Sequence, residues 1–403
     1  MSLPHTNGGP TMKSLIYIGM DVHSKTFSLC AYNPKTRIYS NRIEIENNMK
    51  LVKKYAYNLL SEAEDLDTEL IFGYEAGCLG FTLADDIKKM GFECRVMAPS
   101  TIRIASTDRI RKTDRRDAKS LAEALANDAY SQVHIPDQED REVQAYIRMR
   151  EDVQDMVKQT KQRINAFLLK QGKQYDQGKS KWTICHRKWL KEVELTPLYR
   201  EVLDEYLITL EELEIKVDRY DTRIVEISNQ ERYQEFVDKL SCFKGFTRPI
   251  AMRIVSEIGD FSRFQTAGQF ASYLGLTPSE HSSSESENKG TITKMGNSHV
   301  RKTLIEAAQS MVRGIPGRKS KILKKRQEGN SSKVIHYADK GNMRIQSKFK
   351  RMMNSGKNRN TAITACAREM ACFIWGMATG HIEERVDTPI PVINPETGEI
   401  LVG

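Results

Sequence analysis

The sequence lacks paired cysteines, long apolar runs and the apolar core of a secretory leader. Its seven cysteines are scattered without a CxxC pair, which argues against a zinc ribbon or a disulfide framework. No stretch reaches the roughly 18 consecutive apolar residues that a membrane span needs, and the opening MSLPHTNGGPT is polar. We therefore expect a soluble, cytoplasmic protein with no membrane partner, whose cysteines are reduced and mostly structural.

Acidic residues are scarce in one segment of an otherwise mixed chain. Residues 301–360 hold 17 Lys and Arg against three acids, a net charge of +14, whereas the whole chain carries +9 and the remainder therefore −5. A segment this basic fits binding to a phosphate backbone, where affinity comes from the release of condensed counterions. A solvated or disordered basic loop is the alternative that composition leaves open.

The length of the chain and the changes in its residue pattern predict that the 403 residues form several parts. A chain of this length is long enough for two or three domains that each bury their own core. We expect a disordered leader, for which Met1 or Met12 is the natural start, then an α/β domain, a helical linker, a mainly helical third domain and a mobile tail. Their predicted ranges are 1–13, 14–133, 134–235, 236–383 and 384–403.

The predicted α/β domain begins with three strand-like segments. LIYIGMDV is an apolar run from Leu15, FSLCAYN follows within a few residues, and RIYSNRIEIE alternates apolar and polar side chains. A helix then leads into the strand LIFGYEAG, an amphipathic helix closed by glycine, and the short strand FECRVMAP. A further helix is expected from about Asp117, so the predicted order is β-β-β-α-β-α-β-α.

Two stretches of the predicted linker repeat apolar residues at spacings of three and four, which is typical of paired long helices. The first stretch has polar interruptions at Arg150 and Thr160, and polar seam residues of this kind commonly set register. Joined near GKQYDQGKSKW, the stretches predict a helical hairpin or an oligomeric coiled coil. The seam residues are Val143, Tyr146, Val153, Val157, Ile164 and Phe167, then Leu203, Tyr206, Leu210, Leu213, Val217, Tyr220, Ile224 and Ile227.

Four acidic residues of the α/β domain could meet at one site. Asp21 closes the first predicted strand and Glu75 the fourth, and ligands of open α/β sheets gather at the carboxyl ends of strands. Asp114 and Asp117 lie at a helix entry, where they share one face if the helix reaches back to Asp114. Each acid alone is typical of a turn or an N-cap. The four together, in this order on this strand pattern, predict an active site.

Phosphodiester cleavage explains why four acids would be assembled. Two divalent ions about 3.5–4 Å apart stabilise the attacking and the leaving oxygen. Mg²⁺ takes oxygen ligands and keeps several waters, so three or four carboxylates suffice for a pair of ions. We therefore expect Mg²⁺ as the cofactor, in a two-metal site that needs neither cysteine nor histidine.

Five motifs carry a resemblance to a known family. YIGMDVHSK, YEAG, KTDRRDA, YLGLTPSEHSS and ITKMGNSHVRKTLIEAA stand in this order between about residues 15 and 375. With them, the chain closely resembles the DEDD transposases of bacterial insertion sequences, the group that includes Piv, MooV and the bridge-RNA-guided recombinases. The resemblance implies an RNase H/RuvC-like first domain, a coiled-coil linker for assembly, and a transposase domain that carries a nucleophilic serine.

The resemblance assigns Mg²⁺ binding to Asp21, Glu75, Asp114 and Asp117, and catalysis also to a serine of the HSSS run. Relatives carry a Ser-Ser-Gly-like run there, which makes Ser283 the first candidate nucleophile and Ser282 the second. The chain departs from that pattern, because Ser284 and Glu285 stand where glycines are common. A serine so placed would attack the scissile phosphate and conserve the bond energy in a phosphoserine for strand rejoining.

Basic and polar residues beside these motifs are candidates for nucleic-acid contacts. Those around the acids either clamp phosphates or offset carboxylate repulsion. Those of ITKMGNSHVRK lie at a predicted helix start, where backbone N–H groups can meet phosphate; His299 in that motif is more typical of a helix cap. The candidates are Arg111, Lys112, Arg115, Arg116, Lys294, Asn297, Arg301 and Lys302.

The leading interpretation is an insertion-sequence transposase or site-specific recombinase that cleaves and rejoins double-stranded DNA at the bacterial nucleoid. The resemblance adds a structured guide RNA as a partner and assembly as a homodimer or homotetramer, between which the heptads do not decide. A RuvC-like hydrolytic Holliday-junction nuclease with the same acids is one alternative, and a non-catalytic nucleic-acid-binding protein is another. The DNA target cannot be derived from the chain if a separate RNA carries the specificity.

Overall fold

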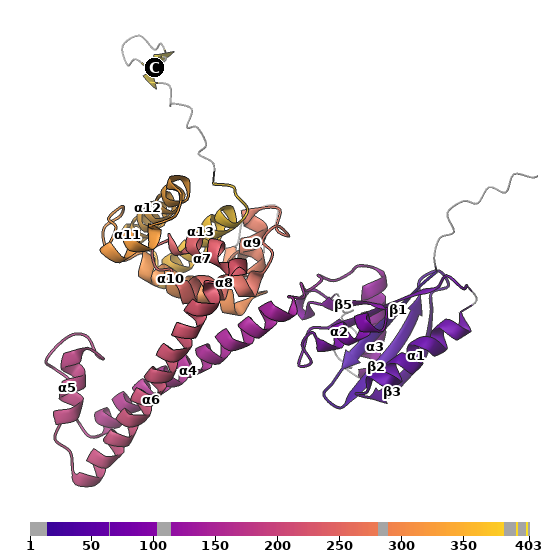
Figure 1. Ribbon diagram of the computed structural model, residues 1–403, viewed down its shortest axis with the longest axis horizontal. Coiled ribbons are helices and arrows are strands. Elements are labelled where there is room, and N and C mark those ends of the chain that lie inside the picture. The colour runs from indigo at the N-terminus through magenta and orange to yellow at the C-terminus, as the bar shows by residue number, and fades with distance from the viewer. Residues whose placement is uncertain are drawn as a thin grey trace, which may run out of the picture. The chain divides into compact units, whose positions relative to one another are not determined.

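The computed structural model describes two compact units, which divide the chain at residues 136 and 137. The first is built on a sheet, and the second is almost entirely helical (Figure 1). This confirms the predicted combination of an α/β region followed by a helical one. The described residues are 14–63, 65–102, 114–280, 289–382, 392–393 and 400–401.

The first unit holds five strands in the spatial order β3-β2-β1-β4-β5. The pairs β1–β2 and β2–β3 are antiparallel, whereas β4 runs parallel to β1 and β5 parallel to β4. Short turns join the antiparallel strands, and a helix precedes each parallel one, because parallel pairing needs a crossover. The strands are β1 (Leu15–Val22), β2 (Thr26–Asn33), β3 (Ile38–Glu46), β4 (Glu69–Glu75) and β5 (Glu93–Met97).

Helices cover both faces of this sheet. Strand residues such as Ile18 and Phe72 pack against α1 and α2, and neighbours such as Tyr17 and Ile71 pack against α3. This period of two is expected of strands buried on both faces. The helices are α1 (Met49–Glu62), α2 (Thr82–Lys89) and α3 (Asp114–Ala126), with a 3-10 turn η1 at Pro99–Thr101. The predicted element order is confirmed, and α3 begins three residues before its predicted start at Asp117.

The backbone of α3 packs directly against the backbone of β1. An ideal Cβ built on Gly19 would lie 2.1 Å from the backbone oxygen of Ala118 and 2.3 Å from the backbone nitrogen of Ala122. Gly73, the register partner of Gly19 on β4, faces the side chain of Leu125 with a corresponding distance of 2.8 Å. Because only glycine leaves room for a helix this close, these two positions fix how deeply α3 lies on the sheet.

Two long helices, α4 and α6, lie side by side in opposite directions in the second unit (Figure 1). Arg150 pairs with Asp221 at 2.8 Å, and Lys161 pairs with Glu214 at 2.7 Å, so the residue number rises along one helix as it falls along the other. The predicted polar interruption Arg150 thus helps to set the alignment of the helices. The seam residues buried between them include Val153, Val157, Ile164, Leu203, Leu210 and Val217. The bounds are Gln138–Lys170 for α4, Ile184–Glu192 for α5 at the far end, and Pro197–Ser228 for α6.

The remaining helices pack around α13, the apolar last helix. Cys366, Met370 and Ile374 of α13 are fully buried, in one cluster with side chains of α7, α8, α9, α10 and α12. The bounds are α7 (Glu231–Ser241), α8 (Arg248–Ile258), α9 (Ala267–Tyr273), α10 (Ser298–Met311), α11 (Lys321–Gln327), α12 (Ser332–Asn354) and α13 (Arg359–Ala378). Short strand pairs are β6 (Pro278–Glu280) with β7 (Lys289–Ile292), and β8 (Val392–Ile393) with β9 (Ile400–Leu401).

The seven cysteines are all free thiols, as their scattered positions predict. Burial raises the pKa of Cys94 to about 12 and the pKa values of Cys242 and Cys366 to about 11. These three thiols are therefore protonated and unreactive near neutral pH. Within the described residues, no helix combines the length and the apolarity that crossing a membrane requires.

Replacing Gly19 with alanine is expected to displace α3. The added Cβ would overlap the backbone of Ala118, and overpacking of this kind costs about 1–3 kcal/mol of unfolding free energy. Denaturant unfolding of the Gly19→Ala variant measures this loss. Gly77→Ala is the matched control, because its Cβ would meet its nearest heavy atom at 3.7 Å and should cost less than about 1 kcal/mol. Equal stability of the two variants would contradict this account of the β1–α3 contact.

Candidate functional site

Asp21 and Glu75 lie on neighbouring strands at the same edge of the sheet. The parallel register of β1 and β4 pairs Gly19 with Gly73 and Met20 with Tyr74, so the next residue on each strand is one of the two acids. Because strand side chains alternate between faces, both acids share the face of the paired glycines, which is the face that α3 covers. Two acids that are 54 positions apart in sequence therefore end neighbouring strands on the same face of the sheet.

The direction of α3 places its first turn at this same edge. Glu123, near the end of α3, accepts a hydrogen bond of 2.9 Å from the Tyr39 hydroxyl, and Tyr39 lies level with Tyr17 through the β1–β2–β3 register. The end of α3 therefore lies toward the start of β1, whose Tyr17 packs against the α3 side of the sheet. It follows that α3 runs antiparallel to β1 and begins near the carboxyl end of that strand.

The helical repeat brings the two aspartates of α3 to the strand ends. Asp114 precedes Ala118 by four residues, about 6 Å along a helix, and Asp21 follows Gly19 by two, about 6.6 Å along a strand. Since Ala118 lies on Gly19, the backbone of Asp114 lies close to the level of Asp21. Asp117 is in the same first turn and is partly buried. The side chains of residues 114–116 are outside the described part of the structure.

His23 is a contact of the site that the sequence analysis missed. Its Nε2 lies 3.3 Å from Oδ2 of Asp21, whose side chain is 20% exposed. His23 is the first residue after β1, and the turn between β1 and β2 brings its imidazole back toward Asp21 of that strand. The motif DVHSK contained this signal, because a polar residue two positions after a strand-end acid can return to it across a tight turn.

The donor set suits a hard divalent cation. Carboxylate oxygens are the ligands that Mg²⁺ prefers, and Asp21, Glu75 and Asp117 carry such oxygens on three elements. Among the residues whose side chains are described, no three His, Cys, Asp or Glu side chains form a group that could hold a metal ion. Since Asp114 is not among those side chains, the complete set of four acids is left as a prediction.

The serine candidates Ser282, Ser283 and Ser284 lie outside the described residues, between β6 and β7. The base of this hairpin is tightly built. An ideal Cβ on Gly296, whose φ is +68°, would lie 1.8 Å from the backbone oxygen of Tyr273, and one on Gly275 would lie 2.4 Å from that of Met295. Only glycine fits at either position.

Arg301 also stabilises the base of the β6–β7 hairpin. Its Nη1 donates to the backbone carbonyls of Leu274 and Met295, each at 2.9 Å, and burial lowers its pKa. Asn297 is the N-cap of α10, and its amide donates to Glu257 at 2.8 Å. These residues, predicted to contact nucleic acid, hold the domain together in this structure.

The other predicted nucleic-acid contacts are placed as follows. Lys302 forms an ion pair of 3.2 Å with Asp155 of α4. Lys294 has a φ of +57°, in the left-handed region, next to the base of the hairpin. The side chains of Arg115 and Arg116 are not described, and Arg111 and Lys112 lie outside the described residues.

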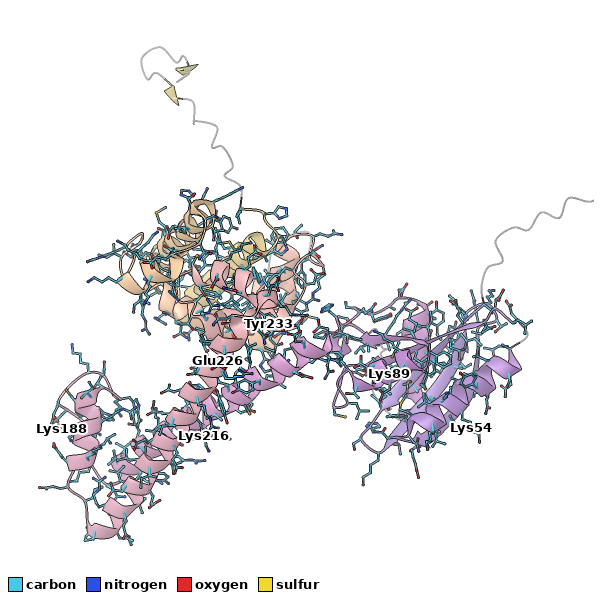
Figure 2. The ribbon with its side chains drawn as sticks, in the orientation of Figure 1. Lys54, Lys89, Lys188, Lys216, Glu226 and Tyr233 are labelled. Carbon is cyan, nitrogen blue, oxygen red and sulfur yellow. The ribbon has the colours of Figure 1, made fainter. Side chains whose placement is uncertain are left out.

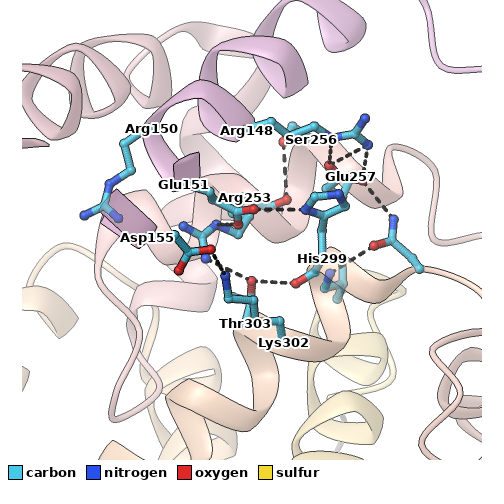
Figure 3. Close-up of polar contacts among 12 residues, drawn as sticks. Arg148, Arg150, Glu151, Asp155, Arg253, Ser256, Glu257, His299, Lys302 and Thr303 are labelled. Atoms are coloured by element: carbon cyan, nitrogen blue, oxygen red, sulfur yellow. Dashed lines mark hydrogen bonds and ion pairs between the residues drawn. The ribbon is translucent and has the colours of Figure 1, made fainter. Parts of the chain in front are cut away.

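A buried polar network joins α4, α8 and α10 (Figure 3). Oε1 of Glu151 lies 2.8 Å from Nε of Arg253, and Oε2 lies 2.9 Å from Nδ1 of His299. Arg253 also donates to Thr303 at 3.2 Å. Burial tends to raise the pKa of Glu151, but the His299 hydrogen bond and the Arg253 charge outweigh it and hold that pKa below its ordinary value. His299 thus contacts α4, whereas Asn297 is the helix cap.

A second ion pair reinforces this junction. Arg148 of α4 donates two hydrogen bonds, of 2.9 and 3.1 Å, to the carboxylate of Glu257, which also receives Asn297 (Figure 3). The bidentate geometry is the stronger form of the Arg–carboxylate contact. The start of α10 is therefore tied to α4 through Glu151 and through Glu257.

A cavity of about 670 Å³ lies between α4, α6 and α8. Its lining includes Arg150 and Lys161, which are paired with acids of α6, and Arg253, which is paired with Glu151. These three cations already have partners within the protein.

The fold and the acids at the strand ends together define a class of protein. A five-stranded sheet of this order, with acids at the ends of β1 and β4 and at the start of the helix packed between them, fits an RNase H-like DEDD domain. Residues 18–171 match a DEDD transposase family of the IS110 type, and residues 237–322 match the Transposase IS116/IS110/IS902 family. Such a DEDD domain indicates the use of a divalent metal.

Named relatives agree with these matches. The chain is 34% identical over 308 residues to y4qE of Sinorhizobium fredii, whose name describes it as a transposase, covering 76% of this chain and 75% of the relative. It is 29% identical over 350 residues to the transposase for insertion sequence element IS1533 of Leptospira borgpetersenii, covering 86% and 99%. It is 21% identical over 379 residues to the transposase for insertion sequence element IS1111A of Coxiella burnetii, covering 92% and 91%.

The chain belongs to the IS110/IS116/IS902 family of insertion-sequence transposases. It is therefore an enzyme whose partner is DNA, which confirms the insertion-sequence transposase of the leading interpretation.

Replacing Glu151 with glutamine should destabilise the second unit strongly. The change leaves Arg253, which is 8% exposed, as a buried charge without its counterion, and this costs about 3–5 kcal/mol of unfolding free energy. Lys302→Ala is the control, because its pair with Asp155 is half-exposed and such pairs contribute about 0–1 kcal/mol. Denaturant unfolding compares the two variants, and equal losses would show that the network does not stabilise the junction.

The same variant should show a defined pH dependence. The pKa of Glu151 is lowered in the folded state, so its stabilisation is complete above the unfolded value of about 4.3 and is lost as pH falls through the folded value. The stability difference between wild type and Glu151→Gln should therefore shrink as the pH falls below about 4. A difference that stays unchanged in that acidic range would contradict this assignment.

Proposed function

We propose that this transposase cleaves and rejoins strands of double-stranded DNA at a metal site formed by Asp21, Glu75, Asp114 and Asp117. The observation that supports it most is the convergence of two strand ends and the first turn of α3 at one edge of the sheet. Ser283 is the proposed nucleophile and Ser282 the second candidate.

Mg²⁺ is the proposed metal, held by the four acids in a two-metal site. When bound, it supplies Lewis-acid stabilisation of charge on the phosphate oxygens. Glu75 is exposed, so DNA can approach it from solvent. The less exposed Asp21 is held by its contact with His23, which orients the carboxylate.

The nucleophile is proposed to come from the second unit. The hairpin of β6 and β7 carries the HSSS run, and its base is fixed by Gly275, Gly296 and Arg301. A fixed base suits a group that must be presented to a phosphate with little loss of conformational freedom. The serine oxygen would form a bond to phosphorus as the bond to the leaving sugar oxygen breaks, and that oxygen would take a proton.

A guide RNA and assembly with further copies complete the proposal. RNA guidance follows from the family resemblance, with general support from the basic segment of residues 301–360. Assembly into a dimer or tetramer is supported by apolar side chains of α6 that face solvent in the single chain. These are Leu198, Val202, Ile208 and Ile215, which are between 36% and 69% exposed.

Neutralising the strand-end acids should abolish strand cleavage without abolishing DNA binding. Asp21→Asn and Glu75→Gln remove metal ligands, so cleavage of an element-end duplex in Mg²⁺ should fall by at least about 10²-fold, and chelation should have the same effect on wild type. Asp86→Asn, in a surface pair with Lys89, is the control and should keep wild-type activity. Recombination that persists in the Asp21→Asn, Asp114→Asn double variant would exclude the metal site.

Serine substitution separates recombination from hydrolysis. In Ser283→Ala, the covalent protein–DNA adduct seen on denaturing gels should disappear together with strand rejoining. If Ser282→Ala has this effect instead, the nucleophile is the neighbouring serine. A RuvC-like hydrolase, the alternative function, would keep cutting in both variants and would form no adduct in wild type. An adduct that survives both substitutions would refute the assignment to this pair.

A further inference from the structure

We propose that the outward face of α12 binds the phosphate backbone of duplex DNA without reading its sequence. The inference rests on the proposed function only in taking DNA as the substrate. The basic segment of residues 301–360 contains α11, α12 and the end of α10, and its cations are not equivalent. Arg301 and Lys302 contact partners inside the domain, whereas Lys340, Lys350 and Arg351 of α12 face outward.

The two sides of α12 differ sharply in composition. Val334, Ala338 and Ile345 are buried on the inner side. The outward side is exposed along the whole helix and carries no acid. Its residues are Lys333, His336, Lys340, Met343, Arg344, Ser347, Lys350 and Arg351.

Two acids beside this face, Asp339 and Glu369, are already neutralised. Asp339, the acid of α12, pairs with Lys319. Glu369 of α13 forms ion pairs with Arg344, at 2.6 Å, and with Lys348, at 2.7 Å. In the part of the chain that the structure describes, Lys340, Lys350 and Arg351 form no ion pair with a carboxylate. The face therefore presents net positive charge to solvent.

The pattern is not the one that stabilises an exposed helix. Lys340 and Arg344 are like charges four residues apart, a spacing that destabilises a helix slightly, and of the two only Arg344 has a carboxylate partner among the described residues. Elsewhere the chain uses the stabilising arrangement, as in the pairs of Lys188 with Glu192 on α5 and Arg200 with Asp204 on α6. A polyanion that lies along α12 removes this repulsion, and it accounts for a face without acids.

The helix is a rigid platform for such a ligand. Gln346 donates to the backbone carbonyls of Met311, at 2.9 Å, and Arg313, at 3.1 Å. Asn342 accepts from the backbone N–H of Lys244 at 2.9 Å. A surface that is already ordered loses little conformational entropy on binding.

The dimensions and chemistry of the face fit a duplex backbone. From Lys333 to Arg351 the helix rises about 27 Å, which is close to eight base-pair steps of about 3.4 Å each. Lysines act as point charges toward phosphate, whereas base reading in the grooves relies on bidentate Arg, Asn or Gln side chains. Asn342 and Gln346 in the middle of α12 are buried, which removes these two amides from that role. We therefore expect contacts that are independent of sequence.

The test is a set of charge variants measured by fluorescence anisotropy on a labelled duplex across a range of salt concentrations. In the full-length Lys340→Gln, Lys350→Gln, Arg351→Gln variant, the Kd should rise about 10- to 100-fold at physiological salt. The slope of log Kd against log salt should fall by about 2–3, on an element-end duplex and on a scrambled one alike.

The matched control removes the same charge elsewhere. Lys54→Gln, Lys188→Gln, Lys216→Gln changes three exposed lysines on α1, α5 and α6 (Figure 2) and should leave the salt slope unchanged. The conservative variant Lys340→Arg, Lys350→Arg, Arg351→Lys should bind like wild type, which distinguishes lost contacts from lost folding.

Three results would overturn the proposal. They are equal weakening in the control, weakening on only one of the two DNA sequences, and weakening on duplex RNA but not on duplex DNA. The proposed function can fail separately. If Asp21→Asn still cleaves while the α12 variant binds DNA weakly, the metal site is wrong and the α12 surface stands. If Asp21→Asn is inactive and the α12 variant binds DNA normally, the metal site stands and the α12 surface is wrong.

Discussion

The direct packing of α3 on β1 is the contact on which the first unit depends. It requires glycine at position 19, because the helix backbone occupies the space that a Cβ would fill. Carboxylates gathered at one sheet edge repel each other unless a cation lies among them, so a closely packed frame is needed to keep them there. The shared face of Asp21 and Glu75 and the nearby first turn of α3 follow from this one approach.

The second unit achieves rigidity by the opposite means. Its junction of α4, α8 and α10 is held by buried charges, with Glu151 between Arg253 and His299 and with Glu257 between Arg148 and Asn297. Buried ion pairs contribute little net stability against an apolar alternative, but they are costly to break singly. Such a junction specifies one alignment of the helices, which suits a region whose β6–β7 hairpin must keep a defined base.

The strands and the acids at their ends could be predicted from the sequence because both depend on local patterns. An apolar run identified β1, alternation of apolar and polar side chains identified β3, and Glu75 ended an apolar strand between glycines. The start of α3 was placed too late, because DRR adds charge without apolar periodicity. The roles of His299 and Arg301 were out of reach, since a contact between residues 148 positions apart, such as Glu151 with His299, leaves no trace in local spacing.

The anchoring of α12 has a consequence for how the protein responds to its ionic surroundings. The side chains that fasten its buried side to neighbouring backbone are neutral carboxamides, those of Asn342 and Gln346. Hydrogen bonds between neutral groups are hardly screened by salt, whereas contacts between exposed cations and phosphates are screened strongly. Rising ionic strength should therefore weaken the binding of a phosphate backbone to the outward side of α12, while the packing of α12 within the domain stays intact. Release of a bound strand then need not involve any loosening of the protein.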